Sequence, residues 1–485
     1  GIKDYSAMYS MKKGKTGVTV SAAKSEQDYY RYKDAKTGKK TKWTGGSDMD
    51  SEKVSIKIDH ELSTCTSLEI GYDYSKYEGL SSGSLSNFYG TSSSDKESNN
   101  IYAKFNWIIN NKDAGYIQMY HNEYDYLSVG APDNPYYSNV LWGDINEKTF
   151  GVDLQQEFSI TNQNKLVAGF SWRESDVLNV ADGYDSTGYP SVERGDQYDE
   201  TVENTAFYIN DTWELSPSWT LNAGVRYDDN SKSGDETTFS AGLNKKFDDN
   251  SHAYINWGEV FKAPTTGDLF AVGMGNPNLK AEKGNSWTLG YATKLDEKTG
   301  LNISYFESDL DDAISWFKNS TGQWAVDNVA KQEKKGMELS LNHKLNENLD
   351  LTASYTYIQV KNDNADGRGF IKDWNYMPNT YRMGIRYHDG KWNTNVWLRA
   401  ANGGATHTYY DIYGSSKVSY LDSSYWTIDM AITYQATKDL SFYAKGYNLF
   451  NEAYAEQAGV DIWGSGSYDY PAQSRRFIVG AEYKF

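Results

Sequence analysis

The sequence predicts an all-β protein that forms one transmembrane antiparallel barrel. Three observations support this fold class: side chains that alternate in character along several segments, connections that alternate between short and long, and a composition suited to a membrane sheet. The 485 residues include 42 Gly, 41 Tyr and 15 Trp but only 8 Pro. Aromatic girdles at the two interfaces and close packing of strands require such a composition. We therefore expect residues 1–485 to form a single barrel domain.

Alternation with a period of two is clearest in segments 219–227, 349–357 and 426–434. In the first segment, apolar side chains occupy every odd position, and Thr, Asn, Gly and Arg occupy the even ones. Successive side chains of a strand point to opposite faces, so each segment has one apolar and one largely polar face. A soluble β-sandwich gives the same alternation, so this pattern alone does not decide between the two folds.

The lengths of the connections distinguish a membrane barrel from a soluble sandwich. Short turns are expected at 12–17, 110–113, 214–218, 296–299 and 436–439. They alternate along the chain with long loops near 31–50, 79–98, 127–146, 177–199, 260–283, 316–330, 361–377, 403–421 and 453–474. Outer-membrane barrels have short periplasmic turns and long extracellular loops, whereas a sandwich has no reason to gather its long loops at one end.

Other features agree with a barrel and exclude several classes of protein. No apolar run of about 18 residues exists, which excludes a transmembrane helix. The mean hydropathy of -0.74 suits a barrel in which alternate side chains face a wet lumen. The net charge of -18 argues against nucleic acid as a partner. The single Cys65 can form no internal disulfide, and no catalytic arrangement of side chains is evident, so we expect no enzyme activity.

Four stretches resemble TonB-dependent receptors of the bacterial outer membrane. Residues 257–265 read Trp-Gly-Glu-Val-Phe-Lys-Ala-Pro-Thr, and residues 275–283 read Gly-Asn-Pro-Asn-Leu-Lys-Ala-Glu-Lys, with Ala281 where the family usually has Pro. Residues 447–454 resemble the family's Asn-Leu-Phe strand. Residues 471–485 resemble its closing strand, which alternates from Phe477 to a terminal Phe485. These motifs also have structural roles: prolines would stiffen a loop, while Asn448 and Asn451 would satisfy backbone groups at a strand end.

The resemblance implies a barrel of about 22 strands that needs a plug, contacts lipid and lipopolysaccharide, and takes up a scarce nutrient with energy from TonB. Neither a plug domain nor a TonB box is recognisable in this chain. Segment 3–11 leads into a short turn and should therefore run toward the periplasm, as the second strand of a family barrel does. We thus expect about 21 strands here, with the first strand supplied by a separate plug polypeptide, because an open edge in lipid is forbidden. Cleavage of an intact transporter is the alternative.

The nearest branch of the family is that of the cobalamin transporters, which residues 228–231, 262–283 and 305–338 resemble most. A ferric siderophore or haem receptor remains an alternative, and a passive porin-like or structural barrel is an alternative of another class. A large ligand should contact flat aromatic and polar side chains in the outer loops. The candidates are Phe270, Met274, Asn276, Trp324, Tyr409, Tyr410, Tyr413 and Trp463.

The resemblance to cobalamin transporters also implies Ca²⁺ in acidic outer loops. Several hard oxygen ligands would have to converge there. By position, Glu78, Asp95 and Asp125 are the candidates. The alternative is that these carboxylates only solvate the loops of an acidic protein.

Overall fold

The computed structural model describes most of the chain. The described residues are 1–43, 48–81, 92–130, 140–184, 190–318, 324–363, 369–373, 376–404, 407–410, 416–419, 424–456 and 471–484. Among them, no helix is long and apolar enough to cross a membrane.

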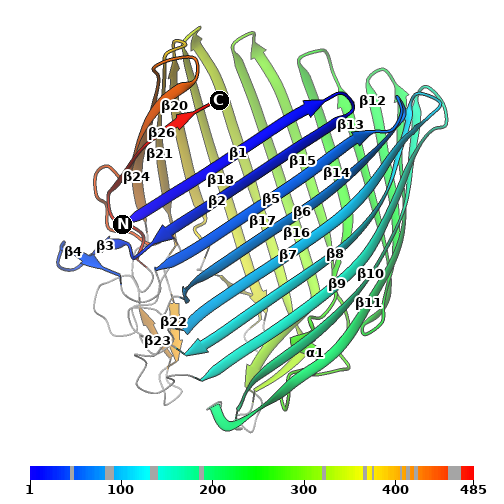
Figure 1. Cartoon of the computed structure of the whole chain (residues 1–485), viewed down its shortest axis with the longest axis vertical. Coiled ribbons are helices and arrows are strands. Elements are labelled where there is room, and N and C mark those ends of the chain that lie inside the picture. The colour runs from blue at the N-terminus through cyan, green and yellow to red at the C-terminus, as the bar shows by residue number, and fades with distance from the viewer. Residues whose placement is uncertain are drawn as a thin grey trace.

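The strands form one 22-stranded sheet that curls into a barrel-shaped wall (Figure 1). One member, β19 (Ile371–Lys372), pairs only with the end of β18, which leaves 21 strands in a continuous series. The series is β1 (Ile2–Lys13), β2 (Thr16–Gln27), β5 (Met49–Glu61), β6 (Thr66–Ser81), β7 (Ser92–Ile109), β8 (Asp113–Gly130), β9 (Leu141–Ser159), β10 (Asn164–Tyr184), β11 (Pro190–Ser216), β12 (Trp219–Asn230), β13 (Gly234–Lys246), β14 (Ser251–Lys262), β15 (Glu282–Asp296), β16 (Thr299–Lys318), β17 (Trp324–Asn346), β18 (Leu349–Asp363), β20 (Asn379–His388), β21 (Trp392–Asn402), β24 (Tyr425–Gln435), β25 (Leu440–Tyr447) and β26 (Arg476–Tyr483).

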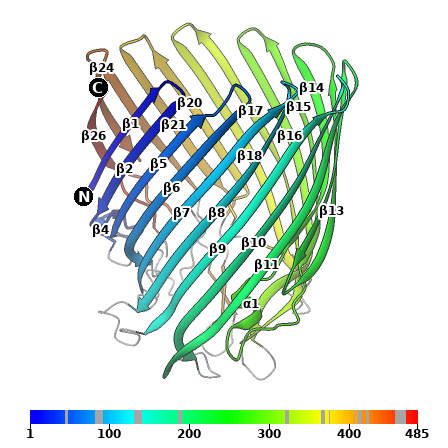
Figure 2. The same cartoon turned by 45° about the vertical axis from the view of Figure 1, so that its right-hand side comes forward.

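Small elements lie between the long strands. They are β3 (Arg31–Lys33) with β4 (Lys40–Lys42), β22 (His407–Tyr410) with β23 (Ser416–Ser419), and the single-turn helix α1 (Thr266–Phe270). All of them belong to connections at the same end of the barrel (Figure 1). This end carries the long connections, and the other carries short turns (Figure 2).

The predicted alternation of connections is confirmed, and so are the three segments that alternate in sequence. They lie in β12, β18 and β24. Every neighbouring pair in the series is antiparallel, as a chain of hairpins requires. The predicted number of strands also agrees with the structure.

The expected lengths of several loops were wrong. Residues 79–81, 177–184 and 190–199 belong to strands, although we expected them in loops. β11 has 27 residues and the neighbouring β12 has 12, so the strands differ greatly in how far they extend. In 177–181 apolar residues occupy both faces of the strand, and Val177 and Ala181 are buried, whereas 190–199 is mostly polar. Neither segment therefore alternates cleanly with a period of two.

The outer face of the wall is apolar and exposed. Ile209, Val225 and Phe239 stand in one row across β11, β12 and β13, and their exposed fractions are 46%, 38% and 50%. A row of exposed apolar side chains would be a liability in water but is what a lipid-facing surface requires. The side chains between them, such as Arg226, point to the lumen and are polar.

Glycine and tyrosine stand opposite each other at several places on the luminal face. At each of these glycines a side chain would overlap the ring of the directly opposite tyrosine, so glycine is required for the ring to lie flat against the wall. The pairs are Gly71 with Tyr102, Gly151 with Tyr120, Gly169 with Tyr208, Gly290 with Tyr254, and Gly480 with Tyr443. This arrangement explains part of the high content of both residues.

The series of strands ends on two edges that face each other. β1 and β26 lie on the same side of the barrel in both views (Figures 1 and 2). Among the described residues, no backbone pairing joins them. Because the 21 strands alternate in direction, the first and the last run the same way, from the long-connection end to the short-turn end. We call the gap between β1 and β26 the seam.

Candidate ligand-binding site

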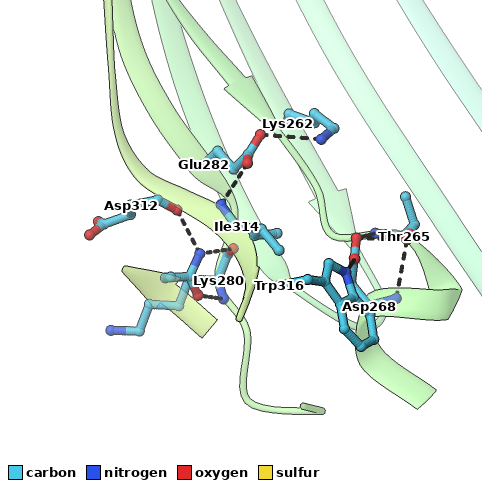
Figure 3. A network of polar contacts seen from close by, with 9 residues as sticks. Lys262, Thr265, Asp268, Lys280, Glu282, Asp312, Ile314 and Trp316 are labelled. Carbon is cyan, nitrogen blue, oxygen red and sulfur yellow. Dashed lines mark hydrogen bonds and ion pairs between the residues drawn. The ribbon is translucent and has the colours of Figure 1, made fainter. Parts of the chain in front are cut away.

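The connection between β14 and β15 contains the end of the family-like stretch 257–265 and most of the stretch 275–283. It folds back onto the extended ends of β16 and β17 (Figure 3). It starts with α1, which begins in a capping box. Thr265 Oγ1 accepts from the backbone N–H of Asp268 at 3.2 Å, and Asp268 Oδ2 accepts from the N–H of Thr265 at 3.0 Å. This reciprocal cap lets a helix of one turn form where the sequence has just passed a proline.

Two carboxylates fasten this connection to β16. Asp268 Oδ1 accepts from Trp316 Nε1 at 2.8 Å, and Glu282 Oε1 accepts from the backbone N–H of Ile314 at 2.7 Å. Glu282 is only 5% exposed, and its second oxygen lies 3.3 Å from Lys262 Nζ. A buried carboxylate is stable only with such partners.

Asn328 on β17 holds the second half of the same connection. Its Oδ1 accepts from the N–H of Lys280 at 2.9 Å, while its Nδ2 donates to the carbonyl oxygens of Lys280 and Asp312 at 3.0 and 2.8 Å. Close to these bonds, Leu269, Leu279 and Val326 form an apolar cluster, each 3% exposed, against which Phe270 and Ile314 pack. The motif therefore builds a fixed platform at the mouth of the barrel.

The family-like stretch 447–454 also has a structural role, as predicted. Asn448 follows β25 with a φ of 48°, a left-handed conformation that Asn tolerates. Its Oδ1 accepts from the N–H of Glu452 at 2.7 Å, and its Nδ2 donates to the carbonyl oxygen of Glu452 at 2.9 Å. Asn451 Oδ1 accepts from the N–H of Arg475 at 3.1 Å. Both side chains thus replace backbone partners at a strand end.

A pocket of about 850 Å³ lies against the inner wall near the long-connection end, between β20 and β26. Arg382, Arg399 and Arg476 line it, together with Asp429 and Glu456. Arg399 pairs with Asp429 at 3.2 Å and with Glu456 at 3.4 Å. The pocket therefore has three guanidinium groups and two carboxylates in a chain of charge -18, which suits a ligand group with oxygen acceptors.

Sequence reasoning missed this pocket, although a signal was present. Arg399 on β21 and Asp429 on β24 both occupy polar positions of alternating segments, and so face the lumen from neighbouring strands. If β21 and β24 are assumed to be neighbours, these opposite charges on the luminal face predict the ion pair between Arg399 and Asp429. Tyr454, in the connection after β25, also lines the pocket, and burial raises its pKa to about 12, so its hydroxyl stays neutral.

The predicted ligand contacts fall into three groups. Phe270, Met274 and Asn276 lie together in the connection that carries the motif, and all three are half-buried. Asn276 donates from Nδ2 to the carbonyl oxygen of Val326 at 3.2 Å, so its amide is already used in the platform. Trp324 begins β17 and is exposed. Tyr409 and Tyr410 lie in β22, of which only the backbone is described. Tyr413 and Trp463 lie outside the described residues.

The three acidic residues proposed for Ca²⁺ lie in strands rather than in loops. Glu78 stands on β6 directly opposite Asp95 on β7, and Asp125 lies on β8 opposite Glu97. Glu78 forms an ion pair with Lys76 at 2.5 Å. Within the described parts of the chain, no group of three or more His, Cys, Asp or Glu residues could hold a metal ion. The Ca²⁺ site stays a prediction.

Comparison with known proteins identifies the family of this chain. The family model described as "TonB dependent receptor-like, beta-barrel" matches residues 28–449. The Vitamin B12 transporter BtuB of Photobacterium profundum is 26% identical over 404 residues, which are 82% of this chain and 59% of that protein. The chain thus spans somewhat more than half the length of this relative.

Solved structures share the fold at low identity. The copper transporter OprC matches with a TM-score of 0.78 at 17% identity, over 99% of this chain and 78% of that one. The ferric enterobactin receptor PfeA of Pseudomonas aeruginosa matches with a TM-score of 0.79 at 15% identity, over 100% and 78%. The chain belongs to the TonB-dependent receptor-like β-barrel family, and it is a protein of the outer membrane.

Proposed function

We propose that this member of the TonB-dependent receptor-like β-barrel family takes up cobalamin across the outer membrane. The observation that carries the proposal is the 26% identity to a vitamin B12 transporter over 82% of the chain. The motif platform and the arginine-lined pocket lie at the long-connection end, where an extracellular ligand would arrive. The family consists of receptors and transporters, which supports transport rather than catalysis.

In this proposal the ligand contacts come from the rim of the platform. Phe270 packs on the platform core, and the N–H of Met274 donates to the carbonyl oxygen of Ala271 at 3.1 Å, so the backbone that carries both apolar side chains is held in a fixed position. A preformed edge loses little entropy when a large rigid ligand binds. Trp324, Tyr409, Tyr410, Tyr413 and Trp463 would complete the site from other connections, and Ca²⁺ near Glu78, Asp95 and Asp125 would order the nearby ends of strands.

We also propose that a separate plug polypeptide supplies one strand to the seam and contacts TonB. Two unpaired edges that run in the same direction fit one additional strand, antiparallel to both. The side chains of β26 at the edge support this view, because Phe477, Val479 and Tyr483 are 68%, 78% and 63% exposed and would face lipid. Edges left open in a bilayer cost several kcal/mol for each unpaired group.

Ligand binding tests the uptake proposal. The complex is purified in detergent from its native membrane, and its affinities for cobalamin, a ferric catecholate siderophore and haem are compared by calorimetry. Saturable binding of cobalamin alone is expected, and Phe270→Ala should weaken it, whereas Phe247→Ala at a short turn should not. Tight binding of the siderophore or haem would replace cobalamin as the substrate. A high single-channel conductance without ligand binding would replace uptake by a passive pore.

A photo-crosslinking amino acid at Val479 tests the second proposal. Its side chain stands on the edge strand and points outward, so a strand in the seam lies within reach. An adduct with a second, smaller polypeptide is expected. An adduct within one polypeptide that contains this barrel would show that the plug strand is covalently continuous with it.

A further inference from the structure

The connection from β2 to β5 contains a small hairpin made of β3 and β4 with its own turn. Asp34 Oδ1 accepts from both the N–H and the hydroxyl of Thr37, at 2.6 and 2.8 Å. Gly38 has a φ of 67°, which lets the chain return toward β4. The hairpin is therefore a formed element.

Aromatic packing fixes the base of this hairpin. Trp43 is 3% exposed and Tyr32 is 6% exposed. The ring of Trp43 stacks on that of Tyr30, with centroids 6.2 Å apart, and meets the ring of Tyr32 edge-on at 5.9 Å. The N–H of Trp43 donates to the carbonyl oxygen of Tyr30 at 2.9 Å. Rings buried to this degree restrict the movement of the hairpin base.

Three hydrogen bonds then join the hairpin to residues 471–475, which lead into β26. The N–H of Ser474 donates to the carbonyl oxygen of Arg31 at 2.7 Å. The Tyr30 hydroxyl donates to the carbonyl oxygen of Pro471 at 3.1 Å, and Lys40 Nζ donates to that of Arg475 at 3.1 Å. A connection that starts at β2 therefore reaches past β1 and holds the start of β26.

These bonds cross the seam at its long-connection end. At the same end, the N–H of Asp28 donates to the carbonyl oxygen of Gly1 at 3.2 Å, which ties the start of β1 to the base of the hairpin connection. This bond continues the β1–β2 pairing, so both edges of the seam are attached to the connection that leads from β2 to β5. At the short-turn end, no comparable bridge joins β1 to β26 among the described residues.

We propose that the β3–β4 hairpin is a clasp that holds the two unpaired edges together at the long-connection end. A strand that completes the barrel then enters from the short-turn end, and its far end stops beneath the clasp. The clasp itself stands on the contacts above, whereas the entry of a strand rests on the proposed two-chain function. The partner that this seam fits is one extended strand, apolar toward lipid and polar toward the lumen.

Hydrogen–deuterium exchange on the purified chain tests the clasp without any partner or ligand. Trp43→Ala removes the buried ring, so exchange at the amides of Trp43 and Ser474 should accelerate on the order of tenfold or more, while β12 and β18 stay unchanged. Trp392→Ala, at a short turn of the barrel, is the matched control and should leave both amides protected. Unchanged exchange at Ser474 in a folded Trp43→Ala protein would overturn the clasp.

A milder variant covers the case in which Trp43→Ala does not fold. Tyr30→Phe combined with Lys40→Met removes two of the three bridging donors and leaves the aromatic packing in place. Exchange at Ser474 should still accelerate, by a smaller factor than in Trp43→Ala. Protection equal to that of the parent protein would again overturn the clasp.

A covalent lock tests the direction of entry. Arg31→Cys and Ser474→Cys, in a Cys65→Ser background, are joined by a short bis-maleimide before the barrel is mixed with the plug fraction from native membranes. Capture of the second chain equal to that of the unlocked barrel is expected. A tenfold lower capture would show that the hairpin must open and would overturn entry from the short-turn end. If the parent barrel captures no second chain, the two-chain function fails, while the exchange data still decide the clasp.

Discussion

Leu279→Ala should detach the motif platform from the wall of the barrel. Leu279 is 3% exposed and packs against Leu269 and Val326 in a cluster that has only a few members. Truncation of a leucine in such a site costs about 2–5 kcal/mol, through lost transfer energy and the cavity that remains. The opening equilibrium of the platform should therefore rise about 30-fold or more, because about 1.4 kcal/mol corresponds to a factor of ten.

Hydrogen exchange of single amides measures this opening directly. The N–H groups of Gly275, Asn276 and Lys280 are bonded within the platform at 2.7, 2.9 and 2.9 Å, so they report its closed state. All three should exchange faster in Leu279→Ala, and cobalamin affinity should fall with them. Leu295→Ala is the control, since this leucine is 61% exposed at a short turn. Unchanged exchange in Leu279→Ala would refute the assignment of the cluster as the support of the platform.

Three further predictions concern single side chains. Glu282→Ala leaves the N–H of Ile314 without its carboxylate and should loosen the platform by about 1–3 kcal/mol in exchange experiments, whereas Glu282→Gln retains an acceptor and should resemble the parent. Burial raises the pKa of Tyr30 to about 12, above its unfolded value of about 10. The stability that this group confers is therefore complete below pH 10 and is lost as the pH rises toward 12. The melting temperature should fall less over that range in Tyr30→Phe than in the parent protein, and an equal fall would exclude Tyr30 as its cause. Gly284→Ala would place a methyl group on the backbone carbonyl of Asp309 in the paired strand, so it should lower the yield of heat-modifiable folded barrel on gels, and a normal yield would show that the two strands can separate locally.

Sequence reasoning predicted the regular part of this fold well. Strands such as β12 bury no side chain in a protein core. One face contacts lipid and the other contacts water, so apolar and polar side chains alternate along the sequence. The direction of β1 and the number of strands followed from the lengths of the connections. The parts of β10 and β11 that extend at the long-connection end were missed, because apolar and polar side chains do not alternate cleanly there.

The site was less predictable because its parts come together through long-range pairing. The family-like motif pointed to the platform, and the structural roles of Asn448 and Asn451 followed from the preference of Asn for strand ends. The partner of Glu282, by contrast, is a backbone N–H on another strand, which no local pattern reveals. The clasp depends on contacts between residues about 440 positions apart, such as Tyr30 and Pro471.

Native mass spectrometry of the detergent-purified complex, with cobalamin added and then under denaturing conditions, tests the central claim most directly. The account predicts one particle that contains this barrel, a second smaller chain and one cobalamin, and that loses both on denaturation. The barrel alone, without a second chain and without cobalamin, would contradict the account and require the proposed uptake mechanism to be withdrawn.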